Sequence, residues 1–315
     1  MNKLVVFGSV NADHVLQVPT FPRPGETLHG RNYQVIPGGK GANQAVAAAR
    51  LKADVGFIAC VGDDSFGINI RESFKVDGIN VSGVKLQPNC PTGIAMIQVS
   101  DSGENSICIS AEANAKLTAE AIEPHLDQIR NAQYLLVQLE TPLDGIIQAA
   151  QVAKNAQTQV ILNPAPAREL PDELLSCIDI ITPNETEAEM LTGITVSDDE
   201  SAQKAADVLH SKGIETVMIT LGAKGVWLSQ NGKGVIIPGF RVKATDTTAA
   251  GDTFNGAFVT GLLEEMPLES AIKFAHAAAA ISVTRFGAQT SIPQRSEVDA
   301  FLAEQKVDAF LAEQK

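Results

Sequence analysis

The chain of 315 residues is 44% apolar and 19% charged, which is typical of a globular protein with a large hydrophobic core and not of a disordered chain. Its formal net charge of −13 argues against a nucleic-acid-binding surface, because phosphate contacts require clustered Lys and Arg. No stretch approaches the roughly 18 apolar residues of a transmembrane helix, and the first residues resemble a strand rather than a signal peptide. We therefore expect a soluble, cytoplasmic protein with neither nucleic-acid nor membrane partners.

Along most of the chain, short β-branched runs alternate with Ala-rich amphipathic segments. This alternation predicts an α/β fold with a mainly parallel central sheet and helices on both faces. The expected strands span residues 4–8, 55–61, 134–138, 160–163, 178–182 and 217–220. The expected helices span residues 42–51, 66–77, 142–155, 185–191, 201–212, 252–264 and 268–285.

Two segments, residues 15–35 and 92–110, interrupt this alternation because they are extended with no helix between their strands. We expect them to form a small β-sheet lid on an α/β domain made of residues 1–14, 36–91 and 111–301. An exposed sheet needs covering, so a homodimer through the lid sheets is expected. Residues 302–315 form a C-terminal tail with a duplicated segment, VDAFLAEQK, which occurs at 298–306 and again at 307–315.

An amide and a carboxylate, Asn11 and Asp13, follow the first expected strand. Ligands of open α/β sheets bind at the carboxyl ends of strands. A carboxylate accepts hydrogen bonds from hydroxyls, and an amide both donates and accepts, so the pair suits a polyhydroxy ligand. The alternative is an ordinary Asn/Asp turn.

A glycine-rich segment, GGKGANQ at residues 38–44, leads into the next expected helix. Successive glycines allow a backbone to approach a ligand closely. The segment matches neither the Walker A pattern nor the dinucleotide fingerprint G-x-G-x-x-G. Lys40 and Asn43 favour a ligand-binding loop over the alternative, a generic glycine turn.

Two polar turns follow later strands. Asn184 and Glu187 carry oxygens that suit hydrated Mg2+ on a nucleotide phosphate, or they belong to the acidic first turn of a helix. Residues 220–225, TLGAKG, either contact a nucleotide or begin a hairpin.

The segment DTTAAGDTF at residues 246–254 places small residues before a long apolar helix. We expect the free backbone amides of Ala249, Ala250 and Gly251 to form an anion hole at the helix start. Asp252 is well placed there as a general base for a hydroxyl that faces the hole. The alternative is that Asp252 caps the helix, since Asp is a favoured capping residue.

The motifs N-A-D-H at 11–14, GGKGANQA at 38–45, NETE at 184–187 and DTTAAGDTFNGAF at 246–258 occur in this order in one chain. Together they resemble the motifs of the ribokinase-like (PfkB) carbohydrate kinase family, and the resemblance extends from the first strand to Phe301. It implies an ATP-dependent sugar kinase that uses Mg2+ and is activated by K+.

The resemblance also implies a role for each matching position. Asp252 would be the catalytic base, and the sugar would contact Asn11, Asp13, Gly39, Lys40, Asn43 and Glu140. Glu187 would hold Mg2+ through water, and the nucleotide would contact Asn184, Thr220, Gly222, Gly225, Gly251 and His276. The K+ ion would bind, partly through backbone carbonyls, at Asp246, Thr248, Ser282, Arg285, Gly287 and Ser291. For this last site, the alternative is that Asp246 caps a turn and pairs with Arg285.

The implied reaction is the phosphorylation of D-ribose at its 5-hydroxyl by ATP to give ribose 5-phosphate. The alternatives are a related kinase for fructose, deoxyribose, a nucleoside or a keto-deoxy sugar acid. A nicotinamide-dependent dehydrogenase would need a glycine fingerprint after the first strand, and a non-catalytic sugar-binding module would not need Asp252 beside an anion hole. One departure from the family pattern is Ala113, where Gly is common, and we expect it to narrow the sugar pocket.

Overall fold

Nine strands form the central sheet of the computed structural model, which describes residues 2–313 and the side chains of residues 2–305. Their order is β13-β12-β11-β10-β9-β8-β1-β4-β5, and only the pairs made by β12 are antiparallel. The strands are β1 (Leu4–Phe7), β4 (Val55–Gly62), β5 (Asn80–Gln87), β8 (Tyr134–Val137), β9 (Gln159–Leu162), β10 (Ile180–Ile181), β11 (Thr216–Thr220), β12 (Gly225–Gln230) and β13 (Lys233–Pro238). The expected α/β fold with a mainly parallel sheet is confirmed.

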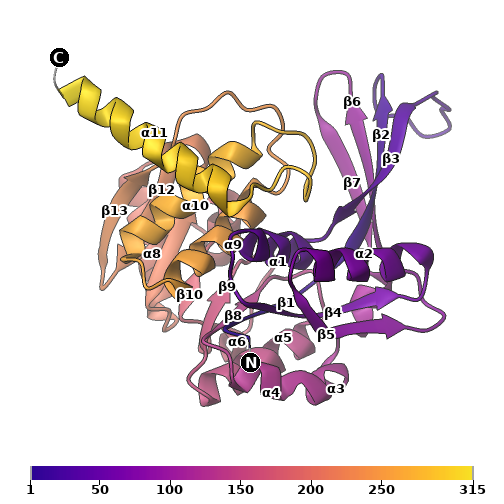
Figure 1. The fold of residues 1–315 in the computed structure, drawn as a ribbon, viewed down its shortest axis with the longest axis horizontal. Coiled ribbons are helices and arrows are strands. Elements are labelled where there is room, and N and C mark those ends of the chain that lie inside the picture. The colour runs from indigo at the N-terminus through magenta and orange to yellow at the C-terminus, as the bar shows by residue number, and fades with distance from the viewer. Residues whose placement is uncertain (1, 314–315) are drawn as a thin grey trace.

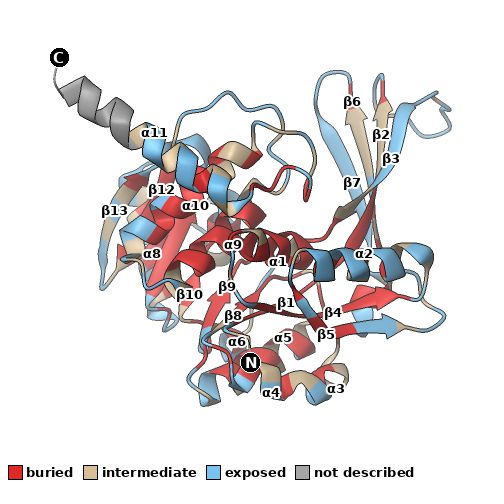
Figure 2. Cartoon of the chain, in the orientation of Figure 1, coloured by how far each residue is buried: buried red, intermediate tan, exposed pale blue. Residues whose placement is uncertain are grey.

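Helices cover both faces of this sheet (Figure 1). Successive residues of β1 alternate between two buried hydrophobic clusters, with Leu4 and Val6 in one and Val5 and Phe7 in the other. The first cluster packs against α1 (Lys40–Arg50), α2 (Ser65–Val76), α9 (Ala250–Leu263), α10 (Leu268–Ser282) and α11 (Arg295–Glu313). The second packs against α3 (Ala119–Ile122), α4 (Leu126–Arg130), α5 (Leu143–Asn155), α6 (Asp172–Leu175), α7 (Glu185–Thr192) and α8 (Asp199–Ser211). The central strands and α1 are accordingly buried in Figure 2.

A second, smaller sheet extends away from the body of the molecule (Figure 1). It has the order β3-β2-β6-β7 and consists of β2 (Asn11–Val18), β3 (Arg31–Gly38), β6 (Gly93–Ser100) and β7 (Asn105–Ser110). The separate small sheet agrees with the expectation from residues 15–35 and 92–110. Its ladders extend further, because Asn11 pairs with both Gly38 and Gly93. Asn11 and Asp13 therefore lie on a lid strand and not on the loop before it.

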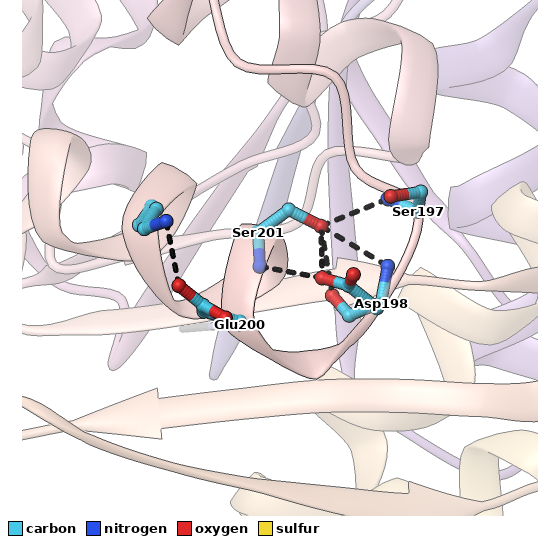
Figure 3. A network of polar contacts seen from close by, with 5 residues as sticks. Ser197, Asp198, Glu200 and Ser201 are labelled. Carbon is cyan, nitrogen blue, oxygen red and sulfur yellow. Dashed lines mark hydrogen bonds and ion pairs between the residues drawn. The ribbon is translucent and has the colours of Figure 1, made fainter.

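Several elements were not expected from the sequence. Edge strand β5 was missed because its sequence, NVSGVKLQ, lacks a continuous apolar run. Short helices such as α4 carry too few residues for a periodic pattern. Helix α8 begins two residues before the expected position 201, because Asp198 caps it. Figure 3 shows this capping box, in which Ser201 N donates to Asp198 Oδ1 (2.8 Å) and Asp198 N donates to Ser201 Oγ (3.0 Å).

The first copy of the duplicated segment is part of α11 and packs against the body. Val298 is fully buried, and the ring of Phe301 packs edge-on against Phe240 with centroids 5.2 Å apart. The second copy of the duplicated segment, residues 307–315, lies outside the residues whose side chains are described. No helix in the described part of the chain has the length and apolarity needed to cross a membrane.

Candidate active site

The first site residues lie at the start of β2, where the lid joins the central domain. Asp13 is buried, and its Oδ1 has no hydrogen-bond partner among the described residues. Gly38 leaves room for this carboxylate, because a Cβ there would lie 2.0 Å from Asp13 Oδ2. Asn11 Oδ1 accepts a hydrogen bond of 2.8 Å from Asn114 Nδ2, and Asn114 is fixed by Val10 N and Val10 O. Asn11 therefore keeps its Nδ2 donor for a ligand, whereas Asp13 offers an acceptor.

The glycine-rich loop enters α1 beside these residues. Gly39 has a φ of 92°, and a Cβ there would lie 2.8 Å from Asn11 N, so this turn requires glycine. Glu140, which follows β8, accepts hydrogen bonds through Oε2 from Lys40 N (3.0 Å) and Ser9 Oγ (2.5 Å). Glu140 thus connects the loop to the end of β1.

Asp252 lies in the first turn of α9 and is held by α1. Asn43 Nδ2 donates to Asp252 Oδ2, and Gln44 Nε2 donates to Asp252 Oδ1, both at 2.9 Å. The helices approach closely at Gly256, where a Cβ would lie 2.6 Å from Gln44 O. The N-cap position belongs to Ala249, so Asp252 does not cap the helix as the alternative proposed. Asn43 Oδ1 is buried without a partner in the described part of the chain, which leaves a second free acceptor beside Asp252.

Charged groups are concentrated in this pocket. Burial and, secondarily, the nearby Glu140 and Asp252 carboxyl groups raise the pKa of Asp13 to about 7, against the opposing effect of Lys40. Burial alone would lower the pKa of Lys40, but Asp252, Glu140, Glu187 and Asp13 together hold it above its usual value. Lys40 therefore stays protonated at neutral pH, in the field of these four carboxyl groups.

The N-terminus of α9 begins beside Asp252. Ala249 precedes the helix in the left-handed conformation, with a φ of 58°. The amides of Ala249 and Gly251 donate no hydrogen bond within residues 2–313, and a Cβ on Gly251 would meet no atom within 4 Å. Ala250 differs from the expectation, because its amide closes a turn with Thr247 O at 3.2 Å. The helix start thus presents two of the three expected amides at the positive end of its dipole.

Asn184 and Glu187 form a capping box at the start of α7. Glu187 N donates to Asn184 Oδ1 and Asn184 N donates to Glu187 Oε2, both at 2.8 Å. Locally, these residues therefore form the acidic first turn of a helix, which was the alternative interpretation. Asn184 also forms an isolated parallel bridge with Thr220 at the end of β11. Burial raises the pKa of Glu187, and only its Oε2 is used by the capping box, so Oε1 fits an outer-sphere contact to Mg2+.

Residues 220–225 start a hairpin, because one 3-10 turn, Gly222–Lys224, connects antiparallel β11 and β12. A Cβ on Gly239 would lie 3.5 Å from both Gly225 Cα and His276 Nδ1, so the turn and His276 of α10 are neighbours. Burial lowers the pKa of His276 to about 4, and its Nε2 is buried with no partner within the residues that the structure describes. A neutral imidazole beside a glycine turn suits the uncharged base of a nucleotide.

The two segments expected to hold K+ meet in the structure. Asp246 accepts hydrogen bonds from Thr248 N (2.9 Å), Thr248 Oγ1 (2.6 Å) and Gly287 N (2.9 Å). Burial opposes ionisation of Asp246, but these bonds outweigh it and lower its pKa. Arg285 pairs with Glu297 at 2.5 Å, so the alternative in which it pairs with Asp246 is wrong. Ser282 Oγ and Ser291 Oγ donate to carbonyls of their own segments, which leaves their lone pairs free to accept.

Comparison with known proteins decides the family. Residues 1–295 match the pfkB family carbohydrate kinase. The chain belongs to this family. It is 59% identical over 299 residues to the ribokinase of Haemophilus influenzae, covering 95% of this chain and 98% of that protein, and 45% identical over 300 residues to the ribokinase of Staphylococcus aureus, covering 95% and 99%. A solved structure of Arabidopsis thaliana ribokinase complexed with ribose and ATP has a TM-score of 0.90 at 37% identity, covering 96% of this chain and 98% of that chain.

In this PfkB kinase, three buried polar residues that were not expected at the site lie directly beneath it. Gln138, Asn163 and Thr182 are each the first residue after a strand, namely β8, β9 and β10. The sequence carries a signal for them, because each is a polar residue that ends an apolar run. Carboxyl ends of neighbouring parallel strands meet at one edge of the sheet, so the three residues gather there.

The departure at Ala113 does not affect the sugar pocket of this kinase. Ala113 is fully buried in a hydrophobic cluster with residues such as Leu117, and its amide donates to Pro91 O. The expectation that Ala113 narrows the pocket is therefore wrong, because its methyl group faces the core.

Proposed function

We propose that this protein is a ribokinase, which transfers the γ-phosphoryl group of ATP to the 5-hydroxyl of D-ribose and releases ribose 5-phosphate and ADP. The observation that carries the proposal is the pair of buried, unpartnered oxygens on Asp13 and Asn43 in the pocket of the Asp252 carboxylate. These oxygens can accept hydrogen bonds from sugar hydroxyls, while Asp252 can accept the proton of one more. The similarity to ribokinases over almost the whole chain supports the same function.

In this proposal, ribose binds between β2 and the glycine-rich loop. Asp13 and Asn43 accept hydrogen bonds from its hydroxyls, and Asn11 donates one through Nδ2. Several of these groups are fixed before the sugar arrives, which lowers the entropic cost of binding. The remaining contacts come from Gly39, Lys40 and Glu140.

Asp252 removes the proton of the 5-hydroxyl as the hydroxyl oxygen attacks the γ-phosphorus. The new O–P bond forms as the bond from the γ-phosphorus to the β,γ-bridging oxygen breaks, and ADP leaves with that oxygen. The free amides of Ala249 and Gly251 stabilise the negative charge that develops. The Ala250 amide also stabilises this charge if its 3.2 Å hydrogen bond to Thr247 O opens.

The nucleotide lies across the carboxyl ends of the strands, along Asn184, Thr220, Gly222, Gly225, Gly251 and His276. His276 presents a neutral ring nitrogen to the base. Bound Mg2+ would neutralise phosphate charge, and Glu187 is the residue that would hold it through water.

The four cysteines, at positions 60, 90, 108 and 177, are all free. Free thiols are typical of reducing compartments, and the reaction needs ATP, so we propose a cytoplasmic location.

We expect K+ to raise the activity several-fold when it is added to enzyme in Na+ or Tris buffer. K+ would supply a fixed positive charge beside the α9 N-terminus. The oxygens that suit it are those of Asp246, Thr248, Ser282, Arg285, Gly287 and Ser291, with backbone carbonyls among them. Asp246→Ala is expected to flatten the response, because the carboxylate organises both segments. Choline chloride at equal ionic strength is the control, and a wild-type rate that stays indifferent to millimolar K+ after contaminating ions are removed contradicts the K+ proposal.

The lid supports a homodimer. Strand register places one set of side chains on the same lid face as Asp13, namely Ala95, Ile97, Ile107 and Ile109. Ile107 and Ile109 are half exposed, and an uncovered apolar sheet face favours association. We expect the enzyme to sediment as a dimer and Ile107→Glu to sediment as a monomer, whereas equal sedimentation coefficients for the two proteins would argue against this interface.

The kinase activity is tested by measuring ADP release with D-ribose, 2-deoxyribose, fructose and adenosine. A site built to bind a hydroxyl discriminates against analogues that lack it, so D-ribose should show the highest kcat/KM, by about tenfold or more over 2-deoxyribose. Higher kcat/KM for another member of the panel would assign the enzyme to that substrate.

A further inference from the structure

A buried hydrogen-bond network runs beneath the catalytic carboxylate. Gln44 on α1 is its centre, and the strand-end residues Gln138 and Asn163 bind it from below. Gln138 Nε2 donates to Gln44 Oε1 at 2.6 Å, and Gln44 Nε2 donates to Asn163 Oδ1 at 3.0 Å as well as to Asp252 Oδ1 at 2.9 Å. Gln44 is fully buried, and Gln138 is only 1% exposed. All three of these hydrogen bonds of the Gln44 amide are therefore made inside the protein.

The chemistry of these partners fixes the orientation of the Gln44 amide. An ionised carboxylate only accepts hydrogen bonds, so the nitrogen of Gln44 must face Asp252. The Asn163 amide is also fixed, because its Nδ2 donates to Thr182 O at 3.3 Å. Its Oδ1 therefore faces Gln44 and can only accept a hydrogen bond from it. Gln138 is in turn held against Gly8, where a Cβ would lie 2.1 Å from Gln138 Oε1. Gln44 is consequently locked as a donor to Asp252.

Asn43, the other partner of Asp252, is bound differently. Its Nδ2 donates to Asp252 Oδ2, but its Oδ1 has no partner within the described residues. The Asn43 amide can therefore turn when a sugar arrives, while the Gln44 amide cannot. The two oxygens of Asp252 are thus unequal, since Oδ1 is held by the protein interior and Oδ2 is held only by a residue of the sugar pocket.

We infer that Gln44 is a positioning residue for Asp252, which holds Oδ1 so that Oδ2 is the atom that receives the proton of the sugar hydroxyl. This role rests on the proposed kinase function. Gln44 touches neither sugar nor nucleotide and acts only through Asp252. The other charged groups near Asp252 are Asp13, Lys40 and Glu187, and none of them is a partner in the bonds that fix Gln44.

The test is Gln44→Met, which keeps the length of the side chain and removes its donor. Loss of one hydrogen bond to a charged group should lower kcat by about 10–100-fold, with the KM values for ribose and ATP changed by less than about threefold. Gln138→Leu removes only the hydrogen bond that anchors Gln44 Oε1. Its kcat should therefore fall less than that of Gln44→Met, and its KM values should also remain unchanged. If Gln44→Met does not fold, Gln44→Leu replaces it, because that side chain also lacks a donor and suits a fully buried position, and the same fall in kcat is expected.

A matched control separates positioning from stability. Thr158 is buried just before β9, at the opposite end of that strand from Asn163, and donates to the carbonyls of Ile129 and Ala132, each at 2.9 Å. Thr158→Val should therefore lower the melting temperature without lowering kcat. A Gln44→Met enzyme with kcat within about threefold of wild type, or one that loses activity through KM, overturns the inference. Asp252→Asn is measured in parallel, because an active Asp252→Asn enzyme would refute the proposed mechanism itself, whereas an inactive one beside a fully active Gln44→Met would refute only the role of Gln44.

Discussion

Replacing Asp252 with Asn is expected to reduce turnover by about 10²–10⁴, the usual contribution of a general base, while ribose binding is retained. Asn is nearly the same shape as Asp, and its side-chain oxygen can still accept the hydrogen bond from Gln44. Its new amide group would face Asn43, which can turn because its Oδ1 has no partner. The substitution therefore removes the proton acceptor without removing the packing between α1 and α9.

The measurement is kcat for ADP release, together with the dissociation constant for ribose by calorimetry and the melting temperature. A preserved dissociation constant and melting temperature establish that the loss lies in the chemical step. Turnover by Asp252→Asn within about threefold of wild type would show that the proton leaves the 5-hydroxyl by another route.

Asp13→Ala is expected to act on the sugar and not on ATP. A buried carboxylate that binds two hydroxyls loses two charge-assisted hydrogen bonds, so the KM for ribose should rise by about 100-fold or more. The KM for ATP should stay nearly constant. Equal effects on both substrates would place Asp13 outside the sugar pocket, and Glu26→Ala on the exposed lid loop is a control that should change neither.

The same carboxylate predicts a pH dependence with a definite sign. Because burial, Glu140 and Asp252 raise the pKa of Asp13 to about 7, the free enzyme loses its charged acceptor as the pH falls below that value. The kcat/KM for ribose in wild type should therefore decline below about pH 7, and Asp13→Ala should lack this part of the decline.

The raised pKa of Asp13 also means that its ionisation destabilises the folded state. This destabilisation is complete above about pH 7 and absent below the pKa of the unfolded state, which is near 3.8. Asp13→Ala should accordingly melt at a higher temperature than wild type at pH 8, and a lower melting temperature would contradict the unpaired state of this carboxylate.

The sequence predicted the central layers of the fold, because buried parallel strands such as residues 55–61 are continuous apolar runs between periodic helices. It did not predict β5, where apolar and polar residues alternate on an edge strand. It also assigned Asn11 and Asp13 to the α/β domain and not to the lid, because a local pattern does not show that the β2 ladder continues to Gly38 and Gly93. Hydrogen bonds between strands distant in the chain decide such boundaries.

The site was predictable where glycines or small residues stand next to a polar group, as at Gly39 and Asp252. Gln138 and Asn163 have a signal as polar residues that end apolar runs, but their bonds to Gln44 were not predictable, because these form only when α1 crosses the ends of β8 and β9. The same holds for Ala250, whose amide is engaged by a turn that depends on the left-handed conformation of Ala249.

The most direct test of the proposed reaction is the position of the phosphoryl group on the product. Wild-type enzyme is incubated with D-ribose, ATP, Mg2+ and K+, and the sugar phosphate is examined by phosphorus–proton correlation NMR. The geometry of Asp252, Asp13 and the α9 N-terminus predicts one ADP for each sugar phosphate, with the phosphorus coupled to the two protons on C5. Phosphorus coupled to the proton on C1, or ADP released without any sugar phosphate, would contradict it.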